Sequence, residues 1–204
     1  QNLKLLFAGM LCWACGEFVW LFCNLILRID LPYPSWPDYF GYIQHGLIQI
    51  IVSIVMIYTQ LKNMPFRWVK HIALLIIMIG FNMGVVYLMR QNGYVIKNDD
   101  VKIYFDLFYP TSHAFGVVAL LIMFSSSTQP HEKYTYYWLC IGSFVFFVAD
   151  FIFVHVTSLP EKNILAYTNG NWVEAIFSAA YIVKARAMMI RFQLTNPEAS
   201  TMLS

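Results

Sequence analysis

The segment from Thr135 to Ser158, TYYWLCIGSFVFFVADFIFVHVTS, decides the fold class of this chain. Its apolar side chains follow one another without the alternation that a half-buried strand requires, and about 20 such residues let a helix cross the hydrocarbon core of a bilayer. Five further stretches have the same character, at residues 4–27, 39–61, 69–89, 108–127 and 170–190. The sequence therefore predicts an all-α protein, a polytopic transmembrane helix bundle with six spans.

The composition favours a membrane protein and excludes two other classes. Of the 204 residues, 59% are hydrophobic and 12% are charged, about half the charged share of a typical soluble domain. A disordered chain would not carry so much apolar surface, and a soluble domain could not cover its exterior with so few charges. The net charge of +2 gives no reason to expect nucleic acid as a partner. We expect the lipid bilayer of the plasma membrane to surround the chain.

The basic residues predict the orientation in the membrane. One side of the predicted bundle collects Lys4, Lys62, Arg67, Lys70, Lys133, Lys184, Arg186 and Arg191, and the other collects Arg28, Arg90, Lys97, Lys102 and Lys162. Cytoplasmic loops carry the excess of lysine and arginine, so both termini are predicted to be cytoplasmic. We expect one domain, the bundle at residues 1–190, followed by a polar cytoplasmic tail at 191–204.

The chain carries a weak internal repeat. The first and fifth predicted spans each hold an acid in mid-segment, Glu17 and Asp150, and each is followed at the next helix start by a second acid, Asp38 or Glu174. Because the two units lie four helices apart, they run in the same direction, as in parallel repeats related by an axis along the membrane normal.

A second pair of segments is spaced alike. Asp38 is followed seven residues later by His45, and Asp106 is followed seven residues later by His113. Seven residues are two helical turns, so each acid and its histidine share one face of a helix.

Three motifs resemble a known family. They read Gly16-Glu17-Phe18-Val19-Trp20, Pro34-Ser35-Trp36-Pro37-Asp38 and Tyr109-Pro110-Thr111-Ser112-His113. They are similar to the multi-helix integral-membrane sensory region found N-terminal to GGDEF diguanylate cyclases and some histidine kinases, which is a prokaryotic family. The resemblance extends from about residue 12 to 185, and Glu174 with Phe177 matches a late motif of an acid followed by an aromatic residue.

The departures from that family limit what it implies. His113 stands where the family usually has an acid, and no GGDEF, EAL or kinase sequence is present. The resemblance therefore implies a sensory or ligand-binding role in signal transduction and carries over no output activity.

The candidate ligand-binding residues are the polar and aromatic side chains of these motifs: Glu17, Trp20, Asp38, His45, Tyr109, His113, Asp150 and Glu174. A charge at the centre of a bilayer costs about 2.5–3.5 kcal/mol on insertion scales, so we expect these acids to face the bundle interior. Two interpretations are open for Glu17 and Asp150, which form either the floor of a polar cavity or hydrogen-bonded pins between helices. Asp38 and Glu174 either cap helix starts or line the mouth of that cavity.

The histidines and outer aromatic residues also allow alternatives. His45, His113 and His155 are core residues, pH-sensing groups or, with Asp38, Asp106 and Asp150, ligands of a metal whose identity is unknown. The outer aromatic residues form an interfacial belt or a cage around an apolar or cationic ligand.

The leading hypothesis is a sensory or ligand-binding module with an outward-facing polar cavity, a small-molecule or lipid ligand, no cofactor and no enzymatic activity. One alternative is an accessory structural subunit that binds a membrane-protein partner or a second copy of itself. A third is an intramembrane metal-dependent hydrolase built from scattered Asp, His and Ser side chains.

Overall fold

A computed structural model of the chain describes residues 2–29, 31, 34–61, 69–91, 100–158 and 172–195. The elements are α1 (Asn2–Leu21), η1 (Phe22–Leu27), η2 (Asp38–Tyr42), α2 (Ile43–Leu61), α3 (Val69–Gln91), α4 (Asp100–Ser126), α5 (Pro130–Ser158) and α6 (Trp172–Thr195). Here η1 and η2 are short π-helical turns, one ending the first helix and one opening the second. The predicted all-α helix bundle is confirmed, and the described residues contain no strand.

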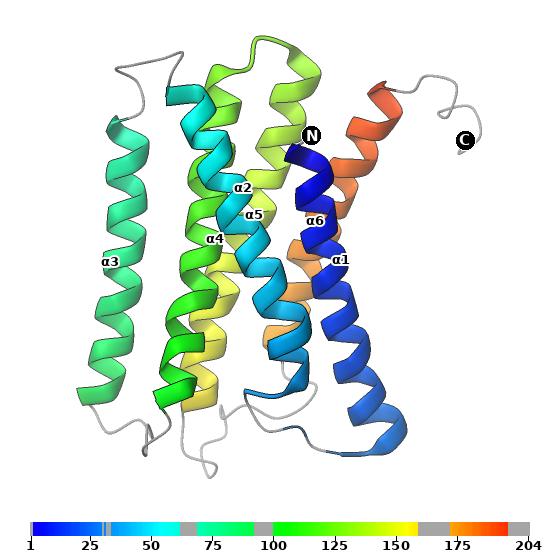
Figure 1. The fold of residues 1–204 in the computed structure, drawn as a ribbon, viewed down its shortest axis with the longest axis vertical. Coiled ribbons are helices and arrows are strands. Elements are labelled where there is room, and N and C mark those ends of the chain that lie inside the picture. The colour runs from blue at the N-terminus through cyan, green and yellow to red at the C-terminus, as the bar shows by residue number, and fades with distance from the viewer. Residues whose placement is uncertain are drawn as a thin grey trace.

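The six helices alternate in direction along the chain (Figure 1). The start of α1 and the end of α6 therefore lie at one end of the bundle, here called the terminal end. The end of α1, η2 and the start of α6 lie at the other, here called the pocket end. The helices that carry the repeated acids run in parallel, α1 with α5 and α2 with α6, as the repeat predicts (Figure 1).

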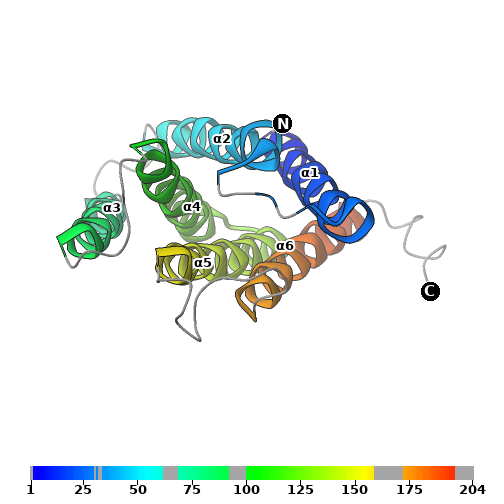
Figure 2. The ribbon, with the colours of Figure 1, turned by 90° about the horizontal axis from the view of Figure 1, so that it is seen from below.

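Seen along the helices, α1, α2, α4, α5 and α6 follow one another around an arc, and α3 lies outside it against α4 (Figure 2). Neighbours along the arc pack against each other, but its two ends do not meet. Among the described residues, no Cα of α1 lies within 8 Å of a Cα of α6. This opening, here called the α1–α6 seam, is bridged only by side chains.

Five segments are long and apolar enough to cross a membrane: Lys4–Leu27, Asp38–Gln60, Val69–Tyr87, Val101–Ser126 and Pro130–Thr157. Their outward side chains include Phe18 and Ile77, which are more than half exposed and suited to lipid. The sixth predicted span is helical in α6, but charged residues such as Lys184 and Arg186 break up its apolar run. Helix α6 continues to Thr195, and residues 196–204 of the predicted tail lie outside the described residues.

Two glycines bring α1 and η2 into direct contact. A Cβ atom on Gly41 would lie 2.5 Å from the Cα of Gly16, so the two main chains touch at this crossing. Small residues permit such close approach between membrane helices. Gly16 precedes Glu17, and Gly41 lies three residues after Asp38, so the crossing fixes two of the candidate acids relative to each other.

Candidate functional site

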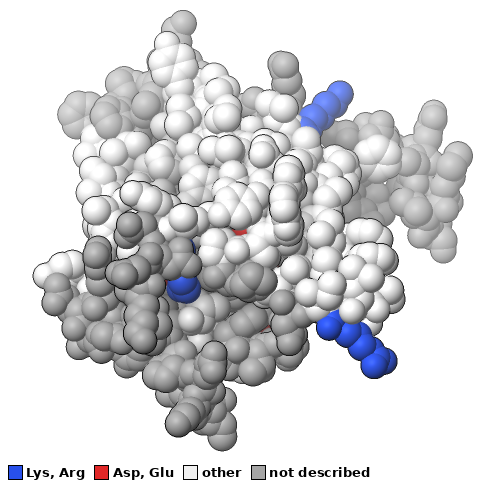
Figure 3. All heavy atoms as spheres, turned by 60° about the horizontal axis from the view of Figure 1, so that its bottom comes forward, with Lys and Arg blue, Asp and Glu red and all other residues white. Residues whose placement is uncertain are grey.

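A cavity of about 90 Å³ lies at the pocket end of the bundle, enclosed by α1, η2, α4, α5 and α6. Its lining residues are Trp13, Glu17, Trp20, Leu31, Ser35, Asp38, Tyr42, Tyr109, Asp150, Phe153, Glu174 and Phe177. We call it the carboxylate pocket. One water molecule needs roughly 10–15 Å³ of such space, so the pocket has room for several waters or a small ligand group. Figure 3 views this end of the molecule, and the acidic atoms in view are confined to small areas, as expected for carboxylates inside the bundle.

The Asp38 carboxylate is held in place from two sides. Its Oδ2 accepts hydrogen bonds from the backbone N–H of Ser35 at 2.7 Å and from the Ser35 hydroxyl at 3.2 Å. Its Oδ1 accepts a hydrogen bond from the Tyr109 hydroxyl at 2.8 Å. The contact with the Ser35 N–H is one half of a capping box, in which the acid three residues on reaches back to the main chain of the residue before the helix. Asp38 therefore both caps the helix start and lines the pocket.

Glu17 and Glu174 approach each other across the α1–α6 seam. The side chains of Trp13 and Tyr42 lie within hydrogen-bonding reach of the Glu17 carboxylate, while the negative charge of Glu174 acts on it unfavourably. Among the described residues, no lysine or arginine lines the pocket. The two glutamates thus face a space that favours positive charge.

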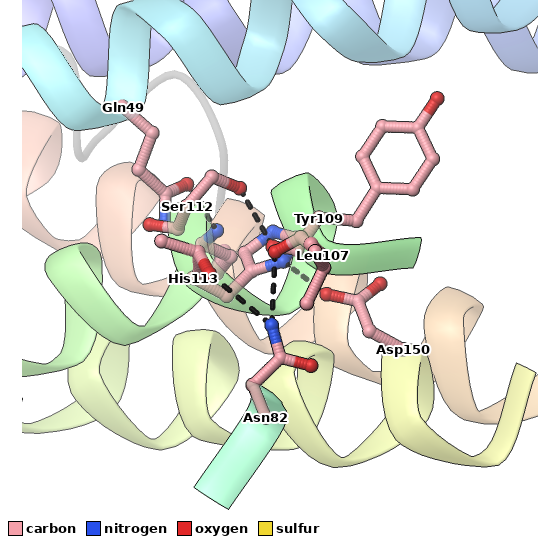
Figure 4. Close-up of polar contacts among 9 residues, drawn as sticks. Gln49, Asn82, Leu107, Tyr109, Ser112, His113 and Asp150 are labelled. Atoms are coloured by element: carbon pink, nitrogen blue, oxygen red, sulfur yellow. Dashed lines mark hydrogen bonds and ion pairs between the residues drawn. The ribbon is translucent and has the colours of Figure 1, made fainter. Parts of the chain in front are cut away.

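Asp150 forms the deepest polar contact of the pocket. Its Oδ2 lies 2.7 Å from Nδ1 of His113, and both side chains are buried (Figure 4). The His113 ring stacks on Phe146, with ring centroids 4.8 Å apart and planes inclined by 7°. Asp150 therefore acts both as an interhelical pin between α5 and α4 and as part of the pocket lining.

Behind His113 a buried polar network continues toward the terminal end. Nε2 of Gln49 donates a hydrogen bond to the carbonyl oxygen of Ser112 at 3.2 Å, and Nζ of Lys184 donates to Oε1 of Gln49 at 3.5 Å. The Lys184 ammonium also lies 4.6 Å from the centroid of the Phe146 ring. On the other side of α4, Nδ2 of Asn82 donates to the carbonyl oxygen of Leu107 at 2.9 Å, which pins α3 to α4 (Figure 4).

The structure brings most of the predicted ligand-binding residues together. Six of the eight line the carboxylate pocket: Glu17, Trp20, Asp38, Tyr109, Asp150 and Glu174. His113 lies beneath them against Asp150, and His45 lies deeper, beside a second cavity. For Asp38 the capping contact and the position in the lining coincide, and for Asp150 the interhelical contact and the position in the lining coincide.

The predicted metal grouping is wrong for the described residues, where no three His, Cys, Asp or Glu side chains are placed to hold a metal ion. His155 lies apart, in a groove between α3 and α5. Asp106 forms an ion pair with Lys102, at 2.7 Å, instead of sharing a site with His113.

The placement of Lys184 at the cytoplasmic face is also wrong, because the residue is buried in the bundle with 5% of its surface exposed. Sequence reasoning also missed Trp13, which packs against Tyr42 and Phe177 with ring centroids 4.5 and 5.8 Å away. One available signal was spacing, since Trp13 lies four residues before Glu17 on the same helix face.

Comparisons with family models, with curated proteins and with solved structures find no match. The resemblance to membrane sensory regions therefore stays a prediction, and the function proposed next is argued mainly from the geometry of the pocket.

Proposed function

We propose that this protein is a membrane-embedded sensory or ligand-binding module with no catalytic output of its own, and that its ligand binds in the carboxylate pocket. The observation that carries the proposal is convergence. Glu17, Asp38, Asp150 and Glu174 come from four different elements and line one cavity. Asp38 and Asp150 are buried and Glu17 and Glu174 are half-buried. Holding four acids inside a membrane bundle is costly, and a bound ligand gives them a common role. The motif resemblance to sensory regions supports the same proposal.

The lining fits a small organic cation. Two of the carboxylates, those of Asp38 and Asp150, already have hydrogen-bond partners within the protein. Glu17 has Trp13 and Tyr42 as neighbours and Glu174 adds a second negative charge, while the described residues of the lining include no lysine or arginine. Aromatic faces such as that of Trp13 surround this space, and an ammonium group within about 6 Å of such a face gains cation–π attraction.

The α1–α6 seam gives a route from binding to signalling. Without a ligand, α1 and α6 are joined by contacts such as the hydrogen bond from the Tyr181 hydroxyl to the Met10 carbonyl oxygen at 3.1 Å. A cation bound between Glu17 and Glu174 draws α6 toward α1. A shift of α6 reaches the terminal end, where Arg191 pairs with Glu132 at 3.1 Å. The ligand changes the conformation only if it binds the closed seam more tightly than the open one.

Choline and its neutral isostere 3,3-dimethylbutan-1-ol test the proposal. Binding to the purified protein in lipid nanodiscs is followed by tryptophan fluorescence, because Trp13 and Trp20 line the pocket. We expect choline to bind and the variants Glu17→Gln and Glu174→Gln to lose about tenfold or more in affinity, which corresponds to about 1.4 kcal/mol. The matched control is Glu132→Gln at the terminal end, which should bind as the native protein does. If the native protein and all three variants bind choline equally well, the carboxylate pocket is not the ligand-binding site.

The accessory-subunit alternative has one supporting observation. A groove of about 350 Å³ between α3 and α5 is lined by apolar and aromatic side chains together with His155, and could accept a partner helix: Phe81, Val85, Phe151, Ile152, His155, Val156 and Trp172. Purification in mild detergent separates the proposals, since a stable stoichiometric partner would favour the subunit. The metal-dependent hydrolase has no supporting donor group among the described residues.

A further inference from the structure

A second cavity lies behind the carboxylate pocket, toward the terminal end, among α1, α2, α4, α5 and α6. Its volume is about 20 Å³, which is enough for one water molecule by the measure used above. Its polar lining residues are His45, Gln49, Ser53, Ser143 and Lys184, and its remaining walls are apolar or glycine.

Several buried polar atoms around this cavity have no hydrogen-bond partner in the protein. Nε2 of His45 and Oγ of Ser143 belong to the lining, and Nε2 of His113 belongs to the ring next to His45, with centroids 5.6 Å apart. All three side chains are more than nine-tenths buried. Both ring nitrogens of His45 lack a hydrogen-bond partner in the protein, and Nδ1 is the one that lies toward Gly9 of α1. Leaving such atoms unpaired costs about 1–3 kcal/mol each, and an ordered water in a polar cavity removes that cost.

The groups facing Lys184 form a path to the carboxylate pocket. From α2 come His45 and Gln49, from α4 comes His113, and from α5 come Asp150 and Ser143. The wall contributed by α1 consists of Leu6, Gly9 and Met10 and carries no charge.

Opposite charges lie at the two ends of this path. Lys184 and Asp150 attract each other electrostatically, although no direct ion pair joins them. Between them stand two imidazoles whose ring centroids are 5.6 Å apart, those of His45 and His113. Beyond Asp150, the neighbouring titratable group is Tyr109, which is committed to Asp38 by a hydrogen bond. An ion pair separated by two histidines has the layout of a proton relay.

We propose that one water in the second cavity, together with His45 and His113, relays a proton between Lys184 and Asp150. In the forward direction Nζ of Lys184 gives a proton to the water, and the water passes one to His45. The other ring nitrogen of His45 releases its proton to Nε2 of His113, and Nδ1–H of His113 releases one to Oδ2 of Asp150. The ammonium becomes an amine and the carboxylate becomes a carboxylic acid, the water is regenerated, and each imidazole is neutral again as its other tautomer.

The relay links the pocket to the core of the bundle. A cation in the carboxylate pocket favours the ionised form of Asp150 and therefore keeps the proton on Lys184, in the middle of α6. This coupling rests on the proposed function, whereas the relay itself does not.

Infrared spectroscopy of the protein labelled with ¹³C at the aspartate carboxyl groups tests the relay. We expect a carboxylic-acid C=O band in the ligand-free protein that shifts in D₂O and disappears in Asp150→Asn. Asp106→Asn is the matched control, because Asp106 is a buried carboxylate paired directly with Lys102, at 2.7 Å. That variant should leave the band in place. The absence of the band in the native protein would overturn the relay.

Thermal melting tests the pairing of the two ends. Lys184→Met and Asp150→Asn should each lower the melting temperature, because each leaves the other end buried without its counter-charge. The double variant should regain most of that loss. If the double variant does not regain stability, the pairing of Lys184 with Asp150 is overturned. If it regains stability but the native protein shows no carboxylic-acid band, the two residues form a static ion pair and the relay is overturned.

Choline separates the two proposals. If choline binds and the band weakens, the coupling holds as described. If choline does not bind but the band is present, the proposed function fails and the relay stands. If choline binds and the band is unchanged, the coupling is overturned.

Discussion

The crossing of Gly16 and Gly41 allows a quantitative prediction for the variant Gly41→Ala. The new Cβ atom would lie 2.5 Å from the Cα and 2.8 Å from the nitrogen of Gly16. Carbon atoms in contact stand about 3.5–4.0 Å apart, so the main chains must separate by roughly 1–1.5 Å. Overpacking of this kind costs about 1–3 kcal/mol. Because both neighbouring atoms are main-chain atoms, no side chain can rotate away to relieve the contact.

The measurement is the thermal unfolding midpoint of the purified protein, followed by tryptophan fluorescence. We expect Gly41→Ala to melt below the native protein and to bind choline more weakly, because η2 carries Asp38 away from Glu17. The matched controls are Gly80→Ala and Gly84→Ala in α3, where a Cβ atom would meet nothing within 4 Å. Alanine is favoured over glycine inside a helix by about 0.5–1 kcal/mol, so these variants should melt at or above the native temperature.

One melting temperature would refute this interpretation. If Gly41→Ala melts as high as the two α3 variants, the helices at this crossing are not in main-chain contact. The account of how Glu17 and Asp38 are held at one pocket would then be wrong.

Three further predictions concern single contacts. Tyr109→Phe removes the hydrogen bond to Asp38 and should cost about 1.5–3 kcal/mol, measured by chemical unfolding; an unchanged stability would mean that another group satisfies the carboxylate. Glu132→Gln breaks the partly exposed pair with Arg191 and should cost less than about 1 kcal/mol, with the difference shrinking at high salt. Phe146→Ala leaves a void beneath the most buried histidine and should cost about 3–5 kcal/mol, because only 1% of the Phe146 surface is exposed. A loss under 1 kcal/mol would mean that the surrounding core collapses into the space.

The sequence alone predicts the helices and most of the pocket lining, for separable physical reasons. Apolar length is a local property, so the six helical segments can be identified without knowing how they pack. An acid inside an apolar segment must face the interior, which places Glu17 and Asp150 on the inner side of their helices. The motif around Ser35 and Asp38 encodes its own capping contacts, because the two residues are only three positions apart.

The sequence-based predictions fail where the rotation of a helix about its axis and its packing on distant helices determine which side chains meet. The grouping of basic residues by side of the bundle places Lys184 at a membrane face, yet the turn of α6 directs it to Gln49, 135 residues away in sequence. The contact of His113 with Asp150 spans 37 residues. No periodicity within one helix specifies such partners, because a helix can rotate about its axis without changing its own pattern.

The first and last helices meet only through contacts that involve side chains, which has a consequence for how a ligand arrives. Side chains that rotate aside at such a junction would admit molecules dissolved in the surrounding leaflet, and a positively charged amphiphile concentrates at an anionic membrane surface before it reaches any protein. The occupancy of such a site follows the amount of ligand per lipid more closely than its concentration in water. Titrations at fixed aqueous concentration but different vesicle loads would then give different apparent affinities for the same protein.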